Sequence, residues 1–457
     1  MELTTPPEAP DGSIFKQFAR QWFEPLVQLA LECSSAEKYP AHTFGAFHYF
    51  FRDLCYVLAR WATITDPAKT HSYVHAKWTQ EETAVAKALI LRIMTITFHS
   101  RQQIRKGNAG FLQALIESWK PQLDYLPLDS RSPILQLIQQ TSSKREEVCK
   151  NTALLMLNVL LVNEIKFVPL SSELCAHLER CMELKPKSVW YPAAQCAGRM
   201  LKTKQGGADF EQAVVRILKT MYEQGEQDRF LEATAAITAH YPPAGTGLLL
   251  QIFSLLNVGT SQYHGKFKQT ILQICEKCMP ISPDVFLHLR PHLSALVHTR
   301  DDETQTRLLK AILSALPTLD ASQLQPLVEI LPGAFSTHSS EICRELYYEV
   351  ISWIYDHDPT SAKTLQSDLC LPLLQGLTDE GGKVEMMPAG SRVAGSSFSA
   401  RSSIKNRVFG FWDVEPHLPL DPLDRLLRLL TTCYHPQLEK HWPVYSALLL
   451  LRLSHRR

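Results

Sequence analysis

Apolar residues recur along most of this chain at steps of three and four, the spacing of one face of an α-helix. In residues 298–317, HTRDDETQTRLLKAILSALP, this stripe consists of Leu308, Leu309, Ile312, Leu313 and Leu316. The same period is present in 84–98, 146–165, 209–224 and 344–358. No alternating pattern bounded by hairpin turns competes with it, so the sequence predicts an all-α protein.

From residue 228 onward the predicted helices come in pairs separated by short turns. The pairs are 228–240 with 246–257, 263–278 with 284–297, 302–316 with 321–331, and 339–356 with 361–377. Each pair occupies about 40 residues, the repeat length of HEAT-type helical hairpins. We therefore expect an α-solenoid of HEAT-like antiparallel helix pairs. The alternative is a helical domain without repeats.

Residues 379–407 interrupt this series of predicted helix pairs, because they are rich in Gly, Ser and Arg and poor in large apolar side chains. Such a composition buries too little surface to offset the entropy of ordering, so we expect one long disordered loop. Phe409, Phe411 and Trp412 are expected to anchor the chain beyond it. The predicted organisation is helical repeats in 1–227, HEAT-like repeats in 228–378, the loop in 379–407 and a final helical hairpin in 408–457.

The composition favours a soluble intracellular protein. Of the 457 residues, 45% are hydrophobic and 20% charged, and the formal net charge is +1. This charge offers no electrostatic reason to expect nucleic acid as a direct ligand. Eleven cysteines without regular spacing favour reduced, buried thiols. We find no signal peptide and no apolar run near the roughly 20 residues that span a bilayer, so no membrane contact is expected.

Asp301, Asp302 and Glu303 lie between His298 and Arg307, which raises the question of a metal or acid–base site. An aspartate is favoured as the N-cap of a helix, and the helix dipole favours further acidic residues in the first turn. Arg307 follows Glu303 by four residues, the spacing of a surface ion pair. We therefore interpret the cluster as the start of a helix.

Two further pairs have spacings known from metal sites. Cys275 and Cys278 form a CxxC motif, but a structural zinc site needs four ligands and no second CxxC is found. His288 and His292 lack the glutamate of an HExxH motif, and Pro291 lies between them. Neither pair is predicted to bind a metal.

The motif FRDL at 51–54 is similar to part of a protein-kinase catalytic loop. That loop has an asparagine five residues after its aspartate, where this chain has Leu58. A Gly-rich phosphate loop, a DFG motif and a GxSxG elbow are likewise not found in the sequence. We therefore predict no catalytic, cofactor-binding or metal-binding residue and expect the chain not to be an enzyme.

Candidate phosphorylation sites occur in the loop and in four Ser-Gln or Thr-Gln dipeptides. The dipeptides begin at Thr79, Ser261, Thr304 and Ser322, and composition alone explains their number. The loop serines are more accessible, and Arg401 is placed to attract a basophilic kinase. These serines are Ser396, Ser397, Ser399, Ser402 and Ser403.

Four stretches of the second half carry a family resemblance. They are RFLEATAAITAHYPP (229–243), HTRDDETQTRLLKAILSALPTL (298–319), CRELYYEVISWIYDHDP (343–359) and FWDVEPHLPLDPLDRLLRLLTTCYHPQLEKH (411–441). In this order they resemble the middle HEAT region of the catalytic subunits of DNA-dependent protein kinases, from about residue 228 to 442. Two stretches earlier in the chain are compatible with the same HEAT region, namely HTFGAFHYFFRDL and VWYPAAQCAGRML. The family has a shorter connection in place of the loop, which is either a lineage-specific insertion or an error in the gene model.

The resemblance implies a non-catalytic scaffold segment of a very large nuclear serine/threonine kinase of the phosphatidylinositol-3-kinase-related group. Such kinases assemble with the Ku heterodimer on DNA ends and act in non-homologous end joining of double-strand breaks. The implied partners are the remainder of the kinase polypeptide, Ku and DNA ends, with no small-molecule substrate. ATP and magnesium bind in the kinase domain, whose residues are not found in this chain, so no cofactor is expected here.

Two expectations concern the extent of the chain. The apolar residues 448–451 are expected to pack against a continuation of the array, which favours a fragment of a longer protein. The alternative is a free-standing HEAT-like adaptor that binds protein segments along its concave face.

Overall fold

The computed structural model describes residues 63–65, 73–75, 80, 83–84, 87, 90–91, 94, 102–120, 123, 125–128, 132–140, 146–168, 172–256, 264–299, 301–331 and 340–358. The chain divides into two compact units, Met1–Gln251 and Ile252–Arg457. The boundary predicted at residue 228 was placed where the family motifs of the second half begin. The predicted organisation into four segments stays a prediction.

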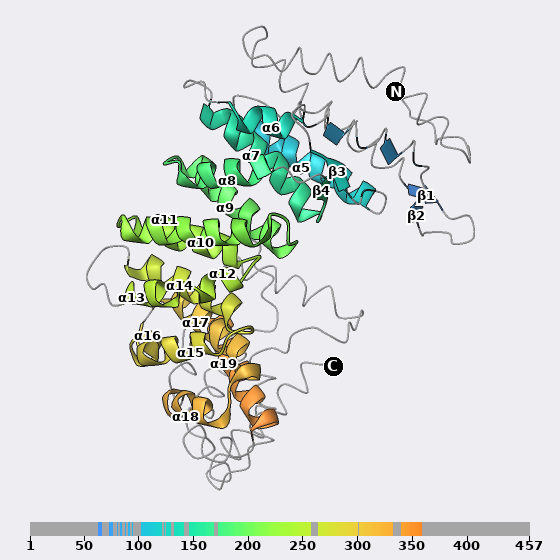
Figure 1. The fold of residues 1–457 in the computed structure, drawn as a ribbon. Helices are drawn as coiled ribbons and strands as arrows, with labels where there is room; N and C mark the ends of the chain where they lie inside the picture. Colours follow the sequence, from blue (N-terminus) through green and yellow to red (C-terminus); the bar gives the residue numbers. More distant parts are fainter. Residues whose placement is uncertain are drawn as a thin grey trace, which may run out of the picture. The chain divides into compact units, whose positions relative to one another are not determined.

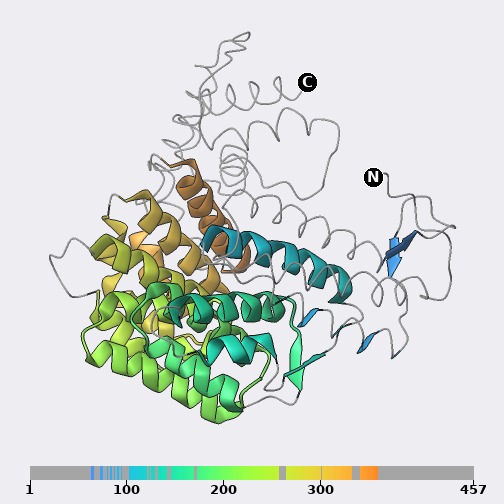
Figure 2. The same cartoon turned by 90° about the horizontal axis from the view of Figure 1, so that it is seen from above.

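Helices make up most of the described part of the first unit. They are α5 (Gln102–Trp119), α6 (Pro133–Ile138), α7 (Glu146–Val162), α8 (Ser172–Glu183), α9 (Lys187–Lys202), α10 (Gly207–Glu223), α11 (Gln227–Thr238) and α12 (Pro243–Thr246). Figure 1 shows α8 to α11 as successive rows of helix, and Figure 2 shows the same helices from above. Helices α7, α9 and α11 pack side by side in one layer, while α8 packs against α10 in a second layer.

The layers of the first unit are held together by an apolar core. Its side chains include Leu154, Phe230 and Ile237, all fully buried. Gly198 permits the close approach of α9 and α11, because a Cβ atom at this position would lie only 2.7 Å from the carbonyl oxygen of Ile237. A side chain of any size at residue 198 would therefore force the two helices apart.

The second unit repeats the two-layer arrangement. Helix α13 (Leu249–Ser254) crosses the boundary, and the further elements are α14 (His264–Cys278), α15 (Asp284–Leu289), η3 (Arg290–His292), α16 (Leu293–Val297), α17 (Asp302–Ala315), η4 (Leu316–Thr318), α18 (Ala321–Ile330) and α19 (Glu341–His357). Helix α17 packs between α14 and α19 in one layer, and α16 packs against α17 and α18. The starts of α14, α17 and α19 are 38 and 39 residues apart, as the predicted helical repeat requires.

The apolar stripe that predicts α17 faces the core. Leu308, Leu309, Ile312 and Leu316 are at most 1% exposed, whereas Leu313 at the edge of the stripe is half-buried. Burial of this stripe confirms the amphipathic pattern from which the all-α fold was predicted.

Two helices that were predicted to be continuous are interrupted, so this part of the prediction was wrong. The helix expected over 284–297 consists of α15, the 3-10 turn η3 and α16. Pro291 lies in this turn, where its missing N–H and its ring disfavour a continuous helix. In place of the helix expected over 246–257, α12 ends at Thr246 with Gly247 as its C-cap, and the short helix α13 begins at Leu249.

Within the described part of the chain, four short strands form pairings that helical periodicity does not predict. Strand β1 (Thr63–Thr65) pairs antiparallel with β2 (Tyr73–His75), and β3 (Tyr125–Pro127) pairs parallel with β4 (Lys166–Val168). In the second pair Leu126 lies opposite Phe167, and both side chains are buried. Each strand has three residues, so these pairings do not change the mainly helical class of the fold.

Several expectations concern parts of the chain that lie outside the described residues. They are the helix at 361–377, the loop at 379–407, the aromatic anchors at 409–412, and the final hairpin at 408–457 with its apolar segment 448–451. Over the described residues, the helices are too short or too polar to cross a bilayer.

Candidate functional site

The acidic cluster at 301–303 is the start of a helix, as predicted. Asp301 is the N-cap of α17, with extended backbone at φ −83° and ψ 116°. Its Oδ2 atom accepts hydrogen bonds from the backbone N–H of Thr304, at 2.9 Å, and from the Thr304 hydroxyl. These contacts satisfy one of the amides that a helix start leaves unpaired.

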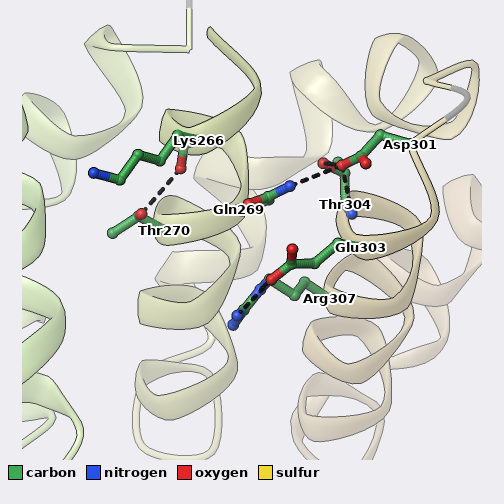
Figure 3. A network of polar contacts seen from close by, with 7 residues as sticks. All are labelled: Lys266, Gln269, Thr270, Asp301, Glu303, Thr304 and Arg307. Carbon is green, nitrogen blue, oxygen red and sulfur yellow. Dashed lines mark hydrogen bonds and ion pairs between the residues drawn. The ribbon is translucent and has the colours of Figure 1, made fainter. Parts of the chain in front are cut away.

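The same carboxylate contacts the neighbouring helix of the layer. Figure 3 shows Gln269 of α14 pointing toward Asp301, and its amide nitrogen donates to Asp301 Oδ2 at 2.9 Å. The Thr304 hydroxyl, and after it the Gln269 amide, hold the pKa of Asp301 below its usual value. Glu303 accepts a hydrogen bond from Arg307 at 2.9 Å one turn along α17. The cluster thus forms a polar contact between repeats.

Gln305 has a structural role that the sequence pattern does not reveal. Its side chain is 1% exposed, and its Nε2 atom donates to the carbonyl oxygens of Leu296, at 3.0 Å, and Val297, at 2.8 Å. It also donates to the carbonyl oxygen of Thr299. Because carbonyl groups at a helix end lack partners within the helix, Gln305 of α17 caps the end of α16.

Arg229 has the corresponding role in the first unit. Its Nη2 atom donates to the carbonyl oxygens of Met182 and, at 2.8 Å, Leu184, at the end of α8. Its Nη1 atom pairs with Glu226 at 2.7 Å, and the guanidinium lies 5.6 Å from the ring centre of Trp190. A polar side chain from the first turns of α11 or α17 therefore holds the end of an earlier helix in each unit.

The two pairs with metal-site spacing face the apolar interior or aromatic rings. Cys275 and Cys278 are at most 1% exposed, and burial raises the pKa of Cys278 to about 12. Phe253 stacks with His288 and with His292, whose ring centres are 5.8 Å and 6.1 Å away. Over the described part of the chain, no three His, Cys, Asp or Glu side chains converge in a way that could hold a metal ion.

The predicted modification sites have different environments. Thr304 is fully buried on α17, whereas Ser322 is exposed at the start of α18 and donates to Asp320 at 2.6 Å. The other candidate phosphorylation sites lie outside the described residues: Thr79, Ser261 and the loop serines Ser396, Ser397, Ser399, Ser402 and Ser403. The FRDL motif at 51–54, which was not assigned a catalytic role, also lies outside them. The phosphorylation of these serines stays a prediction.

Comparison with known proteins places the helical repeats in a family. The family described as DNA-PKcs, CC5 matches residues 88–391, two thirds of the chain. The chain is 25% identical to the DNA-dependent protein kinase catalytic subunit of Gallus gallus over 451 residues, which are 94% of this chain and 10% of that protein. The corresponding proteins of Xenopus laevis and Dictyostelium discoideum are also 25% identical, over 96% and 90% of the chain.

These matches extend the resemblance beyond the motifs of the second half. The family match begins at residue 88, well before residue 228, and ends at residue 391 within the segment predicted as a loop. The chain spans about a tenth of the length of these relatives, so it corresponds to one segment of such a protein. The chain belongs to the DNA-PKcs CC5 family.

Proposed function

We propose that this chain is a non-catalytic scaffold segment of a DNA-dependent protein kinase catalytic subunit and that it serves double-strand break repair by non-homologous end joining. The observation that carries the proposal is the family match over residues 88–391. The stacked helices within each unit supply the physical basis, because a layered array can hold distant parts of a large polypeptide at defined positions.

The contacts between neighbouring helices suit such a role. Apolar side chains between α14, α17 and α19 form one buried layer, and the Gln269–Asp301 contact joins two successive repeats. Each repeat is therefore stabilised by its neighbours. A force applied at one end of the array would be passed on through these contacts.

In this proposal the partners are the remainder of the kinase polypeptide, the Ku heterodimer and DNA ends, and the location is the nucleus. ATP and magnesium would bind in the kinase domain of the whole protein, and this segment would bind no cofactor of its own. The similarity to DNA-dependent protein kinase catalytic subunits supports the assignment to such a polypeptide.

The proposal can be tested with an antibody against this chain and nuclear extract of the source organism. Biotinylated duplex DNA with blunt ends is compared with the same duplex whose ends are closed by hairpins. We expect the antibody to detect a polypeptide much longer than 457 residues that is retained with Ku on blunt ends only. Removal of Ku from the extract should abolish its retention.

Two outcomes would contradict the proposal. Equal retention on open and closed duplexes would show that binding does not depend on DNA ends. Detection of a stable protein of the chain's own length that is not retained on either DNA would favour a free-standing HEAT-like adaptor.

A further inference from the structure

Pro192 lies inside helix α9 and not in its first turn, residues 187–190. Helix α9 begins at Lys187, so Pro192 is its sixth residue. Proline is disfavoured at such a position, because it has no N–H and its ring crowds the carbonyl group four residues earlier. That group belongs to Ser188, which therefore cannot accept the usual hydrogen bond within the helix. One of the bonds that would join the first turn to the rest of α9 is missing.

A side chain of the neighbouring helix α7 supplies a substitute for this bond. Asn151 is 3% exposed, and its Nδ2 atom donates to the carbonyl oxygen of Ser188 at 2.6 Å. A carbonyl group that is removed from water and has no donor would destabilise the fold. Asn151 thus compensates from α7 for the proline in α9.

The first turn of α9 is anchored to its surroundings by side chains. Val189 is fully buried and Trp190 is 5% exposed. The Ser188 hydroxyl donates to Glu147 of α7. The turn therefore has its own contacts with the core and with α7, which do not depend on the backbone bond that Pro192 removes.

The part of α9 beyond Pro192 is anchored separately, by close packing. The buried thiol of Cys196 donates to the carbonyl oxygen of Leu154 in α7 at 3.5 Å. On the other side, Gly198 lies against the backbone of Ile237 in α11. Helix α9 thus consists of two anchored segments, and the backbone between them depends on a bond from α7.

Helix α18 offers a matched comparison. It begins at Ala321, and Pro326 is likewise its sixth residue. The carbonyl group four residues earlier belongs to Ser322, an exposed residue, in surroundings where water can act as the donor. Ser188 is half-buried, and its carbonyl group accepts the Asn151 side chain. The donor from a neighbouring helix is therefore found where access of water is restricted.

We propose that Pro192 and Asn151 form a joint in α9, whose stiffness is controlled by the position of α7. While Asn151 bonds to the Ser188 carbonyl, the two segments of α9 act as one rod. A shift of α7 along α9 withdraws this donor, and α9 then bends at Pro192, as helices do where a proline interrupts the bonding. The joint gives the first unit one place at which the array can bend while the side chains on both sides of it stay packed.

The test measures hydrogen exchange by mass spectrometry on the complete chain. The variants are Asn151→Ala, Pro192→Ala, the combination of both, and the control Pro326→Ala, which removes a proline from the same position of another helix. Exchange is compared between residues 191–195, at the joint, and residues 198–202, in the closely packed part of α9.

We expect Asn151→Ala to speed exchange in residues 191–195 by about tenfold, the effect of losing the bond to a carbonyl group that is shielded from water. Residues 198–202 should change by less than about threefold, because local opening leaves the packed segment in place. Pro192→Ala alone should slow exchange at the joint. In its presence the restored N–H bonds to Ser188, so Asn151→Ala should add less than about threefold. Pro326→Ala should leave exchange in α9 unchanged.

Three results would overturn the proposal. An equal effect of Asn151→Ala with and without Pro192→Ala would show that Asn151 acts independently of the proline. A uniform rise in exchange throughout α7, α9 and α11 would show that the whole unit opens and not the joint. If Asn151→Ala does not fold, Pro192→Ala alone decides: slower exchange in residues 191–195 supports the joint, and unchanged or faster exchange overturns it.

Discussion

The side-chain amide of Gln269 donates a hydrogen bond of 2.9 Å to Asp301 Oδ2 and so joins α14 to the N-cap residue of α17. The same oxygen accepts the backbone N–H of Thr304. One carboxylate therefore both starts a helix and contacts the neighbouring repeat. This arrangement links the local signal that begins α17 to the packing of successive repeats.

Replacing Asp301 by alanine should lower the free energy of unfolding by about 1–2 kcal/mol, because the N-cap acceptor is lost. Asp301→Asn should cost less, since asparagine is also a favoured N-cap residue. The control is Glu303→Ala, which removes the exposed ion pair with Arg307 and one first-turn charge but leaves the N-cap in place, and it should cost less than about 1 kcal/mol. Urea unfolding provides the measurement, and equal losses for Asp301→Ala and Glu303→Ala would contradict the assigned role.

The Asp301 carboxylate also predicts a pH dependence. Its pKa in the folded chain lies below the usual value, first because of the Thr304 hydroxyl and then because of Gln269. A lowered folded pKa contributes stability that is fully present above the unfolded pKa, about 3.9, and is lost as pH falls through the folded pKa. The advantage of wild type over Asp301→Asn should therefore be largest above about pH 4 and shrink in more acidic solution. A constant difference across urea titrations at several pH values would show that the carboxylate charge contributes nothing.

Two glycines provide a matched test of the close helix contact in the first unit. Gly198→Ala should destabilise the chain by about 1–3 kcal/mol, the usual cost of overpacking, because the new Cβ would lie 2.7 Å from the Ile237 carbonyl oxygen. Gly110→Ala, in α5, meets no atom within 4 Å and should stabilise the chain by up to about 1 kcal/mol through helix propensity. Thermal unfolding of both variants should show shifts of opposite sign, and shifts of the same sign would be inconsistent with the contact.

Gln305→Leu tests the cap on the end of α16. Leucine fills a similar volume but cannot donate to the carbonyl oxygens of Leu296 and Val297, so these buried groups would lose their donor. The expected loss in free energy of unfolding is about 1–3 kcal/mol. Gln325→Ala, at an exposed position of α18, serves as the control and should lie within about 0.5 kcal/mol of wild type. A neutral Gln305→Leu would mean that the cap contributes nothing to stability.

Helix starts with a side-chain cap could be predicted well from the sequence, whereas tertiary contacts could not. Asp301 and Ser340 each accept a hydrogen bond at the start of a helix. The predicted start at 302 is that of α17, and the predicted start at 339 lies two residues before that of α19. Pro291 identifies the break between α15 and α16 in retrospect, but the apolar stripe on both sides favoured a continuous helix. The local sequence carries no sign that Gln305 is buried or that Arg229 donates to the end of α8, because both properties depend on which helix packs alongside.

The short strands could not be predicted from the sequence either. Three residues are too few to establish a period of two, and β3 pairs with β4 across a separation of about 40 residues along the chain. The family resemblance, by contrast, was confirmed because it depends on ordered motifs over many helices. The family match also covers the first half of the chain from residue 88, where those motifs were least evident.

The central claim is that this segment consists of stacked helical repeats that serve as a scaffold. An experimental electron-density map of the 457-residue chain would test it most directly. We expect helices beginning near His264, Asp302 and Glu341 to lie side by side in one layer, with Gln269 in contact with Asp301. A map in which these three helices are separated, or in which a sheet encloses a polar cleft with a bound metal or nucleotide, would contradict the claim.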